Sequence, residues 1–379
     1  MHVKKCRNRT KKAKSMISKI INESLIQETK REIEKVNNIV IVSHLSPDGD
    51  SIGSSLAWAN FLSGMEKNVT VIIPNAYPDY YGWMWGIKDV LVYDKQSEVA
   101  DEKIKEAEII FALDFNVLSR IGDMGLRVAD AKGKKILVDH HLDPGNFADI
   151  VISYPQMTST SEMIFRLICR MGYFTDMTQE CAECIFVGLM TDTGSFSYNS
   201  NNPELYTIIS ELIKKGVDKD EIYRRVYNNF SESRFRMLGF LLNKKLKIYP
   251  ELGAALMFLT KEELNTFDYR PGDTEGFVNI PLSIKGVVFS AFFKEDIDKI
   301  RISFRSQGEV AANVFAHEYF NGGGHKNAAG GTLHCSIYDA VKLFDEKIPL
   351  IKEELQKERT RQAVELGEEV ATNENAEGK

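Results

Sequence analysis

The chain has 379 residues, of which 43% are hydrophobic and 27% are charged, and its formal net charge at pH 7 is -6. This length exceeds one ordinary domain and predicts two, and the composition excludes a disordered or fibrous protein. The acidic balance disfavours a protein that grips long nucleic acid over a wide basic surface, and it favours short substrates that carry phosphate.

The chain begins with a basic arm, and no apolar signal core follows it. We interpret residues 1–35 as this arm and a leading helix; the arm is either a solvated extension or an aid to capturing nucleic acid. No apolar run approaches the roughly 20 residues needed to cross a bilayer, so no membrane partner is expected. Five cysteines without a disulfide-like pattern make the cytoplasm the expected location.

Residues 36–230 alternate short apolar strands with helices. A helix is predicted at Ser51–Ser63, and strands are predicted at Asn38–Ser43, Val69–Ile73, Glu108–Leu113 and Lys135–Val138. Fully apolar strands between helices are typical of a parallel sheet that helices cover on both faces. Ligands bind at the carboxyl edge of such sheets, so the residues that follow these strands are the candidate site.

The first strand is followed by His44-Leu45-Ser46-Pro47-Asp48-Gly49-Asp50. Carboxylates and imidazoles together suit divalent metal ions, Mn²⁺ above all. Gly49 lets the loop turn tightly, so Asp48 and Asp50 can face two different ions while His44 reaches one of them. The alternative is an ordinary strand-to-helix loop whose aspartates cap the helix.

Three later motifs carry the same residue types. Asp114 ends a buried strand, where a carboxylate is costly unless it is paired or metal-bound; the alternative is a partly exposed helix cap. In Asp139-His140-His141 the side chains alternate in direction, so one histidine binds metal, the aspartate orients a ring, and the other histidine faces the substrate. Asp192 ends the apolar helix Glu180–Thr191, which by itself indicates only a helix-ending turn.

A second, smaller α/β unit is predicted over residues 248–353, after a linker helix at residues 231–247. Its predicted strands and helices are Ala254–Leu259, Gly286–Phe293, Lys299–Arg305, Val310–Phe320 (helix) and Ser336–Glu353 (helix). The charged tail, residues 354–379, is predicted to be disordered.

Two polar segments are candidates for phosphate contacts. Gly322, Gly323 and Gly324 offer backbone N–H groups as an anion cradle, although a plain turn and helix cap is the alternative. His325 beside them can donate to a phosphate, and Arg305 can bind one bidentately. The segment Thr158–Ser161 is predicted to be a helix N-cap, with a phosphate contact as a further reading.

In this order and on these strand ends, the motifs around His44, Asp114, His140 and Asp192 resemble the DHH family of phosphoesterases. The block Asn321–His325, with Ala328, Ala329 and Gly330, looks like the associated C-terminal domain, DHHA1. The resemblance spans residues 36–351. It implies an α/β fold: an N-terminal DHH domain with a mainly parallel sheet flanked by helices, a smaller C-terminal α/β DHHA1 domain, and a cleft between them.

The resemblance also implies a site of two ions, Mn²⁺ or, as the alternative, Mg²⁺ or another divalent cation. His44, Asp48 and Asp114 would bind one ion, and Asp50, His140 and Asp192 would bind the other, with Asp114 bridging. His141 would contact the scissile phosphate, and Asp139 would support the histidines. The substrate's far end would meet Arg305, Gly322, Gly323, Gly324 and His325, and Asn116 and Arg120 would line the site.

In size the chain is most similar to the NrnA-type subgroup of this family. That similarity implies hydrolysis of short oligoribonucleotides and dinucleotides to mononucleotides, and of 3′-phosphoadenosine 5′-phosphate to AMP. The alternatives are a cyclic-di-AMP or linear-dinucleotide phosphodiesterase, a RecJ-like single-strand exonuclease, a family II pyrophosphatase, which the Gly-Gly-Gly-His block disfavours, and a non-catalytic nucleotide-binding regulator. The sequence allows a homodimer without requiring one.

Overall fold

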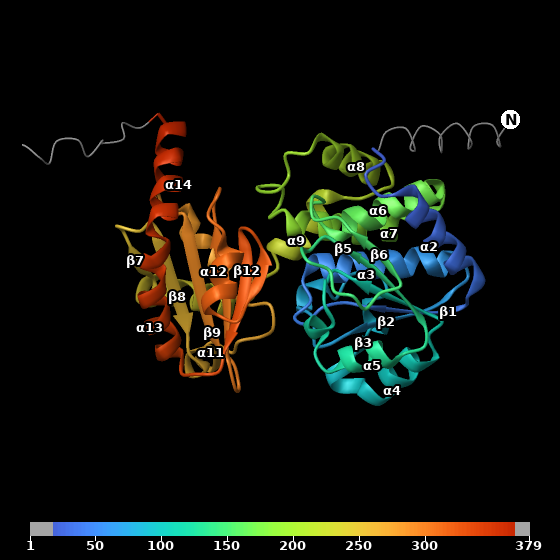
Figure 1. Cartoon of the computed structure of the whole chain (residues 1–379), viewed down its shortest axis with the longest axis horizontal. Helices are drawn as coiled ribbons and strands as arrows, with labels where there is room; N and C mark the ends of the chain where they lie inside the picture. The colour runs from blue at the N-terminus through green and yellow to red at the C-terminus, as the bar shows by residue number, and fades with distance from the viewer. Residues whose placement is uncertain (1–17, 368–379) are drawn as a thin grey trace, which may run out of the picture. The chain divides into compact units, whose positions relative to one another are not determined.

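The computed structural model describes residues 18–367, so most of the predicted basic arm and the last twelve residues lie outside the described part. The chain divides into two compact units, Met1–Asn229 and Phe230–Lys379. Figure 1 labels their helices and strands. Within residues 18–367, every helix is too short or too polar to span a bilayer.

The first unit contains a six-stranded sheet in the order β3-β2-β1-β4-β5-β6, and every pair in it is parallel. Its strands are β1 (Asn38–Val42), β2 (Asn68–Ile73), β3 (Leu91–Val92), β4 (Ile109–Leu113), β5 (Lys134–Asp139) and β6 (Ile150–Ser153). The predicted fold class is confirmed. The sequence analysis missed β3 and β6, because strands of two and four residues carry too little apolar pattern to stand out.

Helices cover both faces of this sheet (Figure 1). They are α2 (Glu23–Lys35), α3 (Gly49–Gly64), α4 (Tyr93–Glu106), α5 (Met124–Asp130), α6 (Thr160–Met171), α7 (Gln179–Asp192), α8 (Pro203–Lys214) and α9 (Lys219–Tyr227). Alternate residues of β1 show the layers: Ile39 and Ile41 pack with α3, α6 and α7, whereas Val40 and Val42 pack with α4 and α5.

Helix α3 is buried almost throughout and crosses α7 at very short range. Gly53 permits this approach, because a Cβ there would lie 2.5 Å from the carbonyl oxygen of Cys184 and 3.0 Å from the amide nitrogen of Gly188. The close crossing matters for the site, because Asp50 lies in the first turn of α3 and α7 ends with Asp192.

The second unit has a mixed sheet in the order β11-β12-β10-β9-β8-β7, in which only β8 and β9 are parallel. Its elements are α10 (Glu232–Phe240), β7 (Lys247–Tyr249), β8 (Ala254–Leu259), α11 (Lys261–Thr266), β9 (Phe289–Glu295), β10 (Ile300–Ser306), α12 (Ala312–Tyr319), β11 (Gly323–His325), β12 (Ala328–Leu333), α13 (Ile337–Lys347) and α14 (Lys352–Glu365). A cluster of phenylalanines that includes Phe289, Phe304 and Phe344 fills the core under α12 and α13.

The predicted linker helix is part of this second unit. Met237 of α10 and Leu241, in the π-helical turn that follows, are fully buried against Met257, Leu259 and Phe277 on the other face of the sheet. The segment is therefore a packed element of the C-terminal unit and not a free connector.

The prediction of disorder from residue 354 is wrong for residues 354–365, which belong to α14. Leu355 is fully buried in the phenylalanine core, and the buried carboxylate of Glu358 accepts hydrogen bonds from Arg361 and from the backbone N–H of Glu309. The sequence hid this helix because only these two positions are buried, while most of its other residues are charged or polar.

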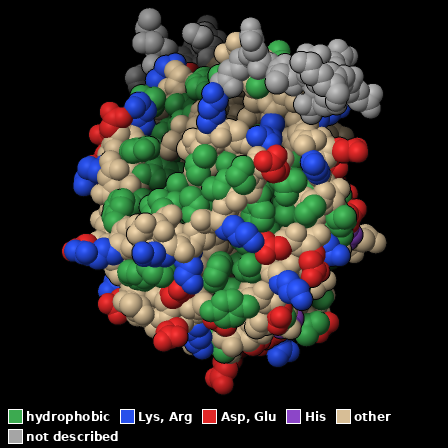
Figure 2. Space-filling view, turned by 90° about the vertical axis from the view of Figure 1, so that its left-hand side faces the viewer, with side chains coloured by type: hydrophobic (Ala, Val, Ile, Leu, Met, Phe, Trp, Pro, Cys, Tyr) green, Lys and Arg blue, Asp and Glu red, His purple; other side chains and the backbone are tan. Residues whose placement is uncertain are grey.

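Figure 2 shows the side of the second unit on which α13 and α14 lie, where apolar side chains form a band between charged ones. Exposed apolar residues of these two helices include Tyr338 and Val364. Bands of this kind often mark contact surfaces. The homodimer that the sequence allows stays a prediction.

Replacing Gly53 by Ala tests the helix crossing. The new methyl group meets backbone atoms of α7 that cannot rotate away, so we expect the free energy of unfolding to fall by about 1–3 kcal/mol. At Gly64, in the same helix, an added Cβ would meet no atom within 4 Å, so Gly64→Ala should leave stability unchanged or slightly higher. The free energies of unfolding of the two variants are measured in urea. If Gly53→Ala were as stable as Gly64→Ala, the tight crossing of α3 and α7 would be contradicted.

Replacing Leu355 by Ala tests whether α14 belongs to the second unit. Because the side chain is fully buried, its truncation should lower the free energy of unfolding by about 2–5 kcal/mol. Leu350 is 62% exposed, so Leu350→Ala should change stability by no more than about 0.5 kcal/mol. If Leu355→Ala unfolds at the same midpoint as the wild type, the packing of α14 does not stabilise the second unit.

Candidate two-metal site

The predicted metal ligands come together at the carboxyl edge of the first sheet. β1, β4 and β5 are neighbours in the sheet, so the loops that follow them meet, and they carry His44, Asp114 and His140. Asp114 itself has a left-handed backbone, with φ +65°. A non-glycine residue in that conformation is strained, and such strain is concentrated at functional sites.

One group of ligand atoms comes from His44, Asp48 and Asp114, which lie within 4.8 Å of one another. The Nε2 atom of His44 is 3.3 Å from Oδ2 of Asp114 and 3.9 Å from Oδ1 of Asp48. His44 and Asp114 are buried, whereas Asp48 is partly exposed. This is the set that the family resemblance implies for the first ion.

A second group comes from Asp50, His140 and Asp192, again within 4.8 Å of one another. The Nε2 atom of His140 is 3.4 Å from Oδ2 of Asp192, 3.5 Å from Oδ1 of Asp114 and 3.9 Å from Oδ2 of Asp50. The two oxygens of Asp114 therefore face different groups, which is the arrangement that a bridging carboxylate needs.

The histidine rings are oriented through their Nδ1 atoms. Nδ1 of His44 lies 2.9 Å from the carbonyl oxygen of Leu45, that of His140 lies 3.3 Å from the carbonyl oxygen of Met157, and that of His141 lies 2.7 Å from Oδ1 of Asp139. Because each of these partners is an acceptor, Nδ1 carries the proton and Nε2 keeps the lone pair for a ligand.

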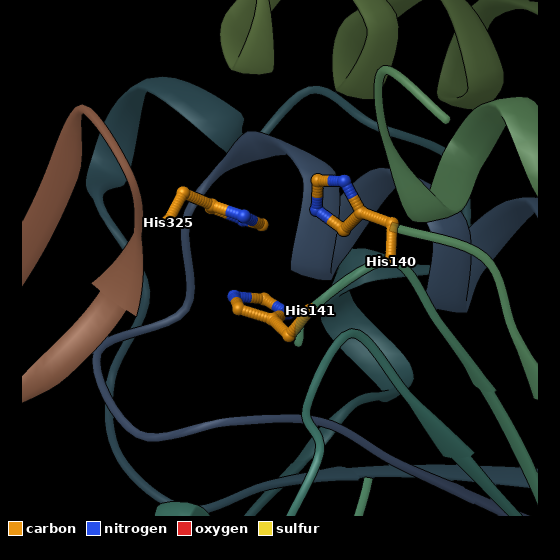
Figure 3. A group of neighbouring side chains, drawn as sticks. All are labelled: His140, His141 and His325. Atoms are coloured by element: carbon orange, nitrogen blue, oxygen red, sulfur yellow. The ribbon is translucent and has the colours of Figure 1, made fainter. Parts of the chain in front are cut away.

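His140 and His141 follow β5 and turn in different directions. Their rings are 5.0 Å apart at an interplanar angle of 71°, and Figure 3 shows both side chains leaving the same stretch of backbone. His140 thus joins the carboxylates of the second group, whereas His141 and Asp139 form a further cluster with Asp114. The two adjacent histidines are not equivalent, as the alternation of side chains predicts.

The carboxylates repel one another in this buried place. Burial raises the pKa of Asp50, and the charges of Asp114 and Asp192 raise it further. Burial also acts to raise the pKa of Asp114, but hydrogen bonds with His140 and His44 outweigh it and hold that pKa well below its usual range.

The pKa values of His44 and His140 are raised by the neighbouring carboxylates, whereas that of His141 is lowered. Burial acts to lower the pKa of both His44 and His140, but the hydrogen bond with Asp114 and the charge of Asp48 raise that of His44, and Asp192 and Asp114 raise that of His140. For His141 burial outweighs the hydrogen bond with Asp139, so its pKa is lowered.

Asp48 does two things at once. It is the N-cap of α3, and its Oδ1 atom accepts hydrogen bonds from the backbone N–H groups of Asp50 and Ser51. The capping alternative is therefore correct for this residue, yet its carboxylate still lies within the first ligand group. The cap fixes the carboxylate at the place where an ion would meet it.

The sequence analysis missed the part played by the start of α6. Both oxygens of Asp50 accept backbone N–H groups, from Thr160 at 2.6 Å and from Ser161 at 2.8 Å, and the hydroxyl of Thr160 donates to Oδ1 of Asp114 at 2.9 Å. Ser159 is the N-cap, as predicted for this segment. A phosphate contact here is wrong for the two amides, because Asp50 occupies them.

Gly188 is a second missed residue. A Cβ at this position would lie 1.9 Å from Oγ of Ser161 and 2.6 Å from Oδ1 of Asp50. Glycine is thus required for α7 to pass beside both groups. The only sequence signal was its place in the Gly188-Leu189-Met190-Thr191-Asp192 segment.

Asn116 and Arg120 lie close to the ligand loops. The side chain of Asn116 donates to the carbonyl oxygens of Leu142 and Asp143 and so holds the loop after the histidines. The carbonyl oxygen of Arg120 accepts the N–H of Leu45, and the charge of Arg120 acts to lower the pKa of His44 and His141. Their role in lining the site stays a prediction.

In the second unit Gly323 and Gly324 belong to β11, which pairs antiparallel with β12, so the alternative of a turn and helix cap is wrong for these two. Gly322 precedes the strand, and its N–H donates to the carbonyl oxygen of Ala316 in α12, so the cap alternative is correct for it. A Cβ on Gly322 would lie 1.9 Å from the carbonyl oxygen of Gly330, and Gly324 has φ +137°. By contrast, a Cβ on Gly323 would meet no atom within 4 Å. The fold thus explains two of the three glycines and leaves Gly323 without a structural reason.

The other candidate residues of this unit lie on the same sheet. His325 ends β11, where it pairs with Ala328, and Figure 3 labels its ring. Arg305 lies on β10, next to Ala328 in the register, and its guanidinium donates to the carbonyl oxygen of Phe304. Arg301 forms an ion pair with Asp296.

The first-unit residues fit divalent cations. Carboxylate oxygens and imidazole nitrogens are the donor set of Mn²⁺ and similar ions, and the histidines present Nε2 toward the carboxylates. The charges of Asp114 and Asp192 help to raise the pKa of Asp50. A bound cation would offset this repulsion, because metal coordination stabilises a buried carboxylate.

Comparison with known proteins agrees with this geometry. Residues 38–189 match the DHH family, N-terminal domain, and residues 255–356 match the DHHA1 domain. The bifunctional oligoribonuclease and PAP phosphatase NrnA of Thermus thermophilus is 29% identical over 87% of this chain and 94% of its own. The protein of the same name from Bacillus subtilis is 27% identical over 85% of this chain and 97% of its own.

A solved relative is more similar still. The crystal structure of an exopolyphosphatase-related protein from Bacteroides fragilis is 54% identical and covers 90% of this chain and 100% of its own, with a TM-score of 0.85. With both domains matched and this relative aligned over its whole length, the chain belongs to the DHH family of phosphoesterases, carries the DHHA1 domain, and is a hydrolase.

Proposed function

We propose that this protein is a Mn²⁺-dependent phosphoesterase that hydrolyses short oligoribonucleotides to mononucleotides and 3′-phosphoadenosine 5′-phosphate to AMP. The observation that carries the proposal is the pair of ligand groups joined by Asp114, on a chain whose curated relatives of similar length are bifunctional oligoribonucleases and PAP phosphatases. We take Mg²⁺ as the alternative ion and the cytoplasm as the place of action.

In this proposal His44, Asp48 and Asp114 hold one cation, and Asp50, His140 and Asp192 hold the other, with Asp114 shared. When bound, such a pair supplies Lewis acidity to a phosphoryl group and acidifies water. The contacts that Thr160 and Ser161 make with Asp50 and Asp114 fix the direction of these two carboxylates.

His141 has the second role at this site. Asp139 occupies its Nδ1 side at 2.7 Å, so the ring cannot rotate freely, and Nε2 lies on the opposite side of the ring. Because Nδ1 already carries a proton, Nε2 carries one only in the imidazolium form, and we propose that in this form it donates to a phosphate oxygen or to the leaving oxygen.

The second unit is proposed to bind the rest of the substrate. Arg305 and His325 supply donors for phosphate oxygens, and the backbone around Gly323 offers N–H groups that no side chain obstructs. A substrate of two to a few nucleotides needs only such a short row of contacts, which agrees with the acidic net charge of -6.

A second candidate is hydrolysis of cyclic-di-AMP or of its linear dinucleotide. The cyclic-di-AMP phosphodiesterase PdeA of Listeria monocytogenes is 26% identical over 88% of this chain, although the match covers 49% of PdeA. The metal ligands would be the same in both functions, so the substrate decides between them.

A panel of substrates separates these functions. The purified protein is incubated, with Mn²⁺ and with chelator, with labelled oligoribonucleotides of two to twenty residues, 3′-phosphoadenosine 5′-phosphate, cyclic-di-AMP, pyrophosphate and polyphosphate. Preference for the dinucleotide and for 3′-phosphoadenosine 5′-phosphate supports the proposal. Preference for cyclic-di-AMP, for polyphosphate or for the longest strand would replace it.

Replacing Asp192 by Asn tests the metal assignment. The change keeps the shape of the side chain but removes a charge from the second ligand group, so turnover of a dinucleotide with Mn²⁺ should fall by at least about 100-fold. Asp220 is 85% exposed at its side chain, and Asp220→Asn should keep wild-type turnover. Wild-type turnover of Asp192→Asn would remove Asp192 from the site.

Replacing Gly323 by Ala tests the substrate contact. The added methyl group meets no protein atom within 4 Å, so the thermal midpoint should stay at the wild-type value, while KM for a dinucleotide should rise roughly 10-fold because the methyl group stands where the substrate binds. Gly322→Ala is the matched control: its Cβ would meet the carbonyl oxygen of Gly330, so the thermal midpoint itself should fall. An unchanged KM for Gly323→Ala would exclude this contact.

A further inference from the structure

The first turn of α6 reaches proposed metal ligands through both its backbone and a side chain. The N–H groups of Thr160 and Ser161 donate to the two oxygens of Asp50, and the hydroxyl of Thr160 donates to Asp114. Asp50 and Asp114 lie 110 and 46 residues away from Thr160 in the sequence, so these are tertiary contacts and not local caps.

The contacts to Asp50 satisfy two needs at once. The first N–H groups of a helix have no partner inside the helix, and the helix N-terminus favours a negative charge. A carboxylate that accepts one N–H on each oxygen cannot rotate about its terminal bond without losing both hydrogen bonds. Asp50 therefore presents its remaining lone pairs in a fixed direction toward His140 and Asp192.

The contact to Asp114 is made by a side chain. Oδ1 of Asp114 accepts the hydroxyl of Thr160 at 2.9 Å and lies 3.5 Å from Nε2 of His140, whereas Oδ2 faces His44. The hydroxyl thus fixes which oxygen of Asp114 turns to which ligand group. That choice matters for a carboxylate that is shared between two ions.

The first turn of α6 is held in place by the buried ion pair of Glu162 and Arg166. The carboxylate of Glu162 accepts the N–H and the hydroxyl of Thr158 at 3.0 and 2.7 Å, and Arg166 donates to Glu162 through Nε at 2.8 Å and Nη2 at 2.6 Å. Glu162 and Arg166 are 0% and 1% exposed, and Arg166 also bonds Glu204 at the surface. The turn is anchored independently of any ion.

We propose that Thr160 is a positioning residue of the metal centre: its hydroxyl sets the orientation of Asp114 as the shared carboxylate, while the first turn of α6 fixes Asp50. This inference rests on the proposed two-metal function. Groups that orient a metal ligand typically change metal affinity or activity 10- to 100-fold when they are removed, and Thr160 touches the ligand that both ions share.

The test is Mn²⁺ binding to the full chain, measured by isothermal titration with Mn²⁺ alone. Thr160→Val removes the hydroxyl and keeps the size of the side chain, so the dissociation constant for Mn²⁺ should rise about 10-fold, while the thermal midpoint in chelator stays within a few degrees of wild type. Thr160→Ser keeps the hydroxyl and should bind Mn²⁺ as wild type does.

Thr29→Val is the matched control. The hydroxyl of Thr29 is buried and has no hydrogen-bond partner among the described residues, and Thr29 lies on α2, which carries none of the proposed ligands, so Mn²⁺ binding should stay at the wild-type value. If Thr160→Val does not fold, Thr160→Ala carries the same test with a smaller side chain.

Three outcomes would count against this role. Wild-type affinity in Thr160→Val, or equal weakening in Thr29→Val, would overturn the role of the Thr160 hydroxyl and leave the two-metal site intact. Failure of the wild-type protein to bind Mn²⁺ would overturn the proposed function itself, and the role of Thr160 with it.

Discussion

The site depends on keeping mutually repelling carboxylates together in a buried place. Asp50 and Asp114 are 1% and 2% exposed, and each would be costly there without partners. Histidines meet Asp114 from two sides, and the amides of a helix start meet Asp50. These contacts hold the carboxylates in place but leave their mutual repulsion, which a bound cation would relieve.

The fold supplies the positions through two simple devices. Parallel strands bring His44, Asp114 and His140 to one edge, because β1, β4 and β5 are neighbours in the sheet. The remaining carboxylates arrive on helices, and there glycine is decisive: Gly53 lets α3 approach α7, and Gly188 lets α7 pass Asp50 and Ser161. The strained backbone of Asp114 shows that the sheet edge alone does not place the shared carboxylate.

The sequence predicts the residues of the ligand groups well and the helix contacts that hold them poorly. An aspartate that ends an apolar strand has few alternatives, so Asp114 and Asp139-His140-His141 could be placed at the sheet edge from pattern alone. The contacts of Thr160 could not, since they reach across 46 residues to Asp114 and 110 residues to Asp50, and a run of Thr and Ser before an apolar helix signals only a cap. Likewise α14 was missed because two inward positions, Leu355 and Glu358, leave no clear periodicity.

The three glycines of the block in the second unit are present for different reasons. Gly322 and Gly324 are required by the backbone, because a side chain would strike β12 or strain φ. Their presence therefore says nothing about a ligand, and a protein with the same hairpin and no substrate would need them too. Gly323 has open space where a side chain would stand, so its reason has to come from outside the fold. Of the three glycines it is the one that the fold does not require, and the proposed close approach of a substrate to the backbone would account for it.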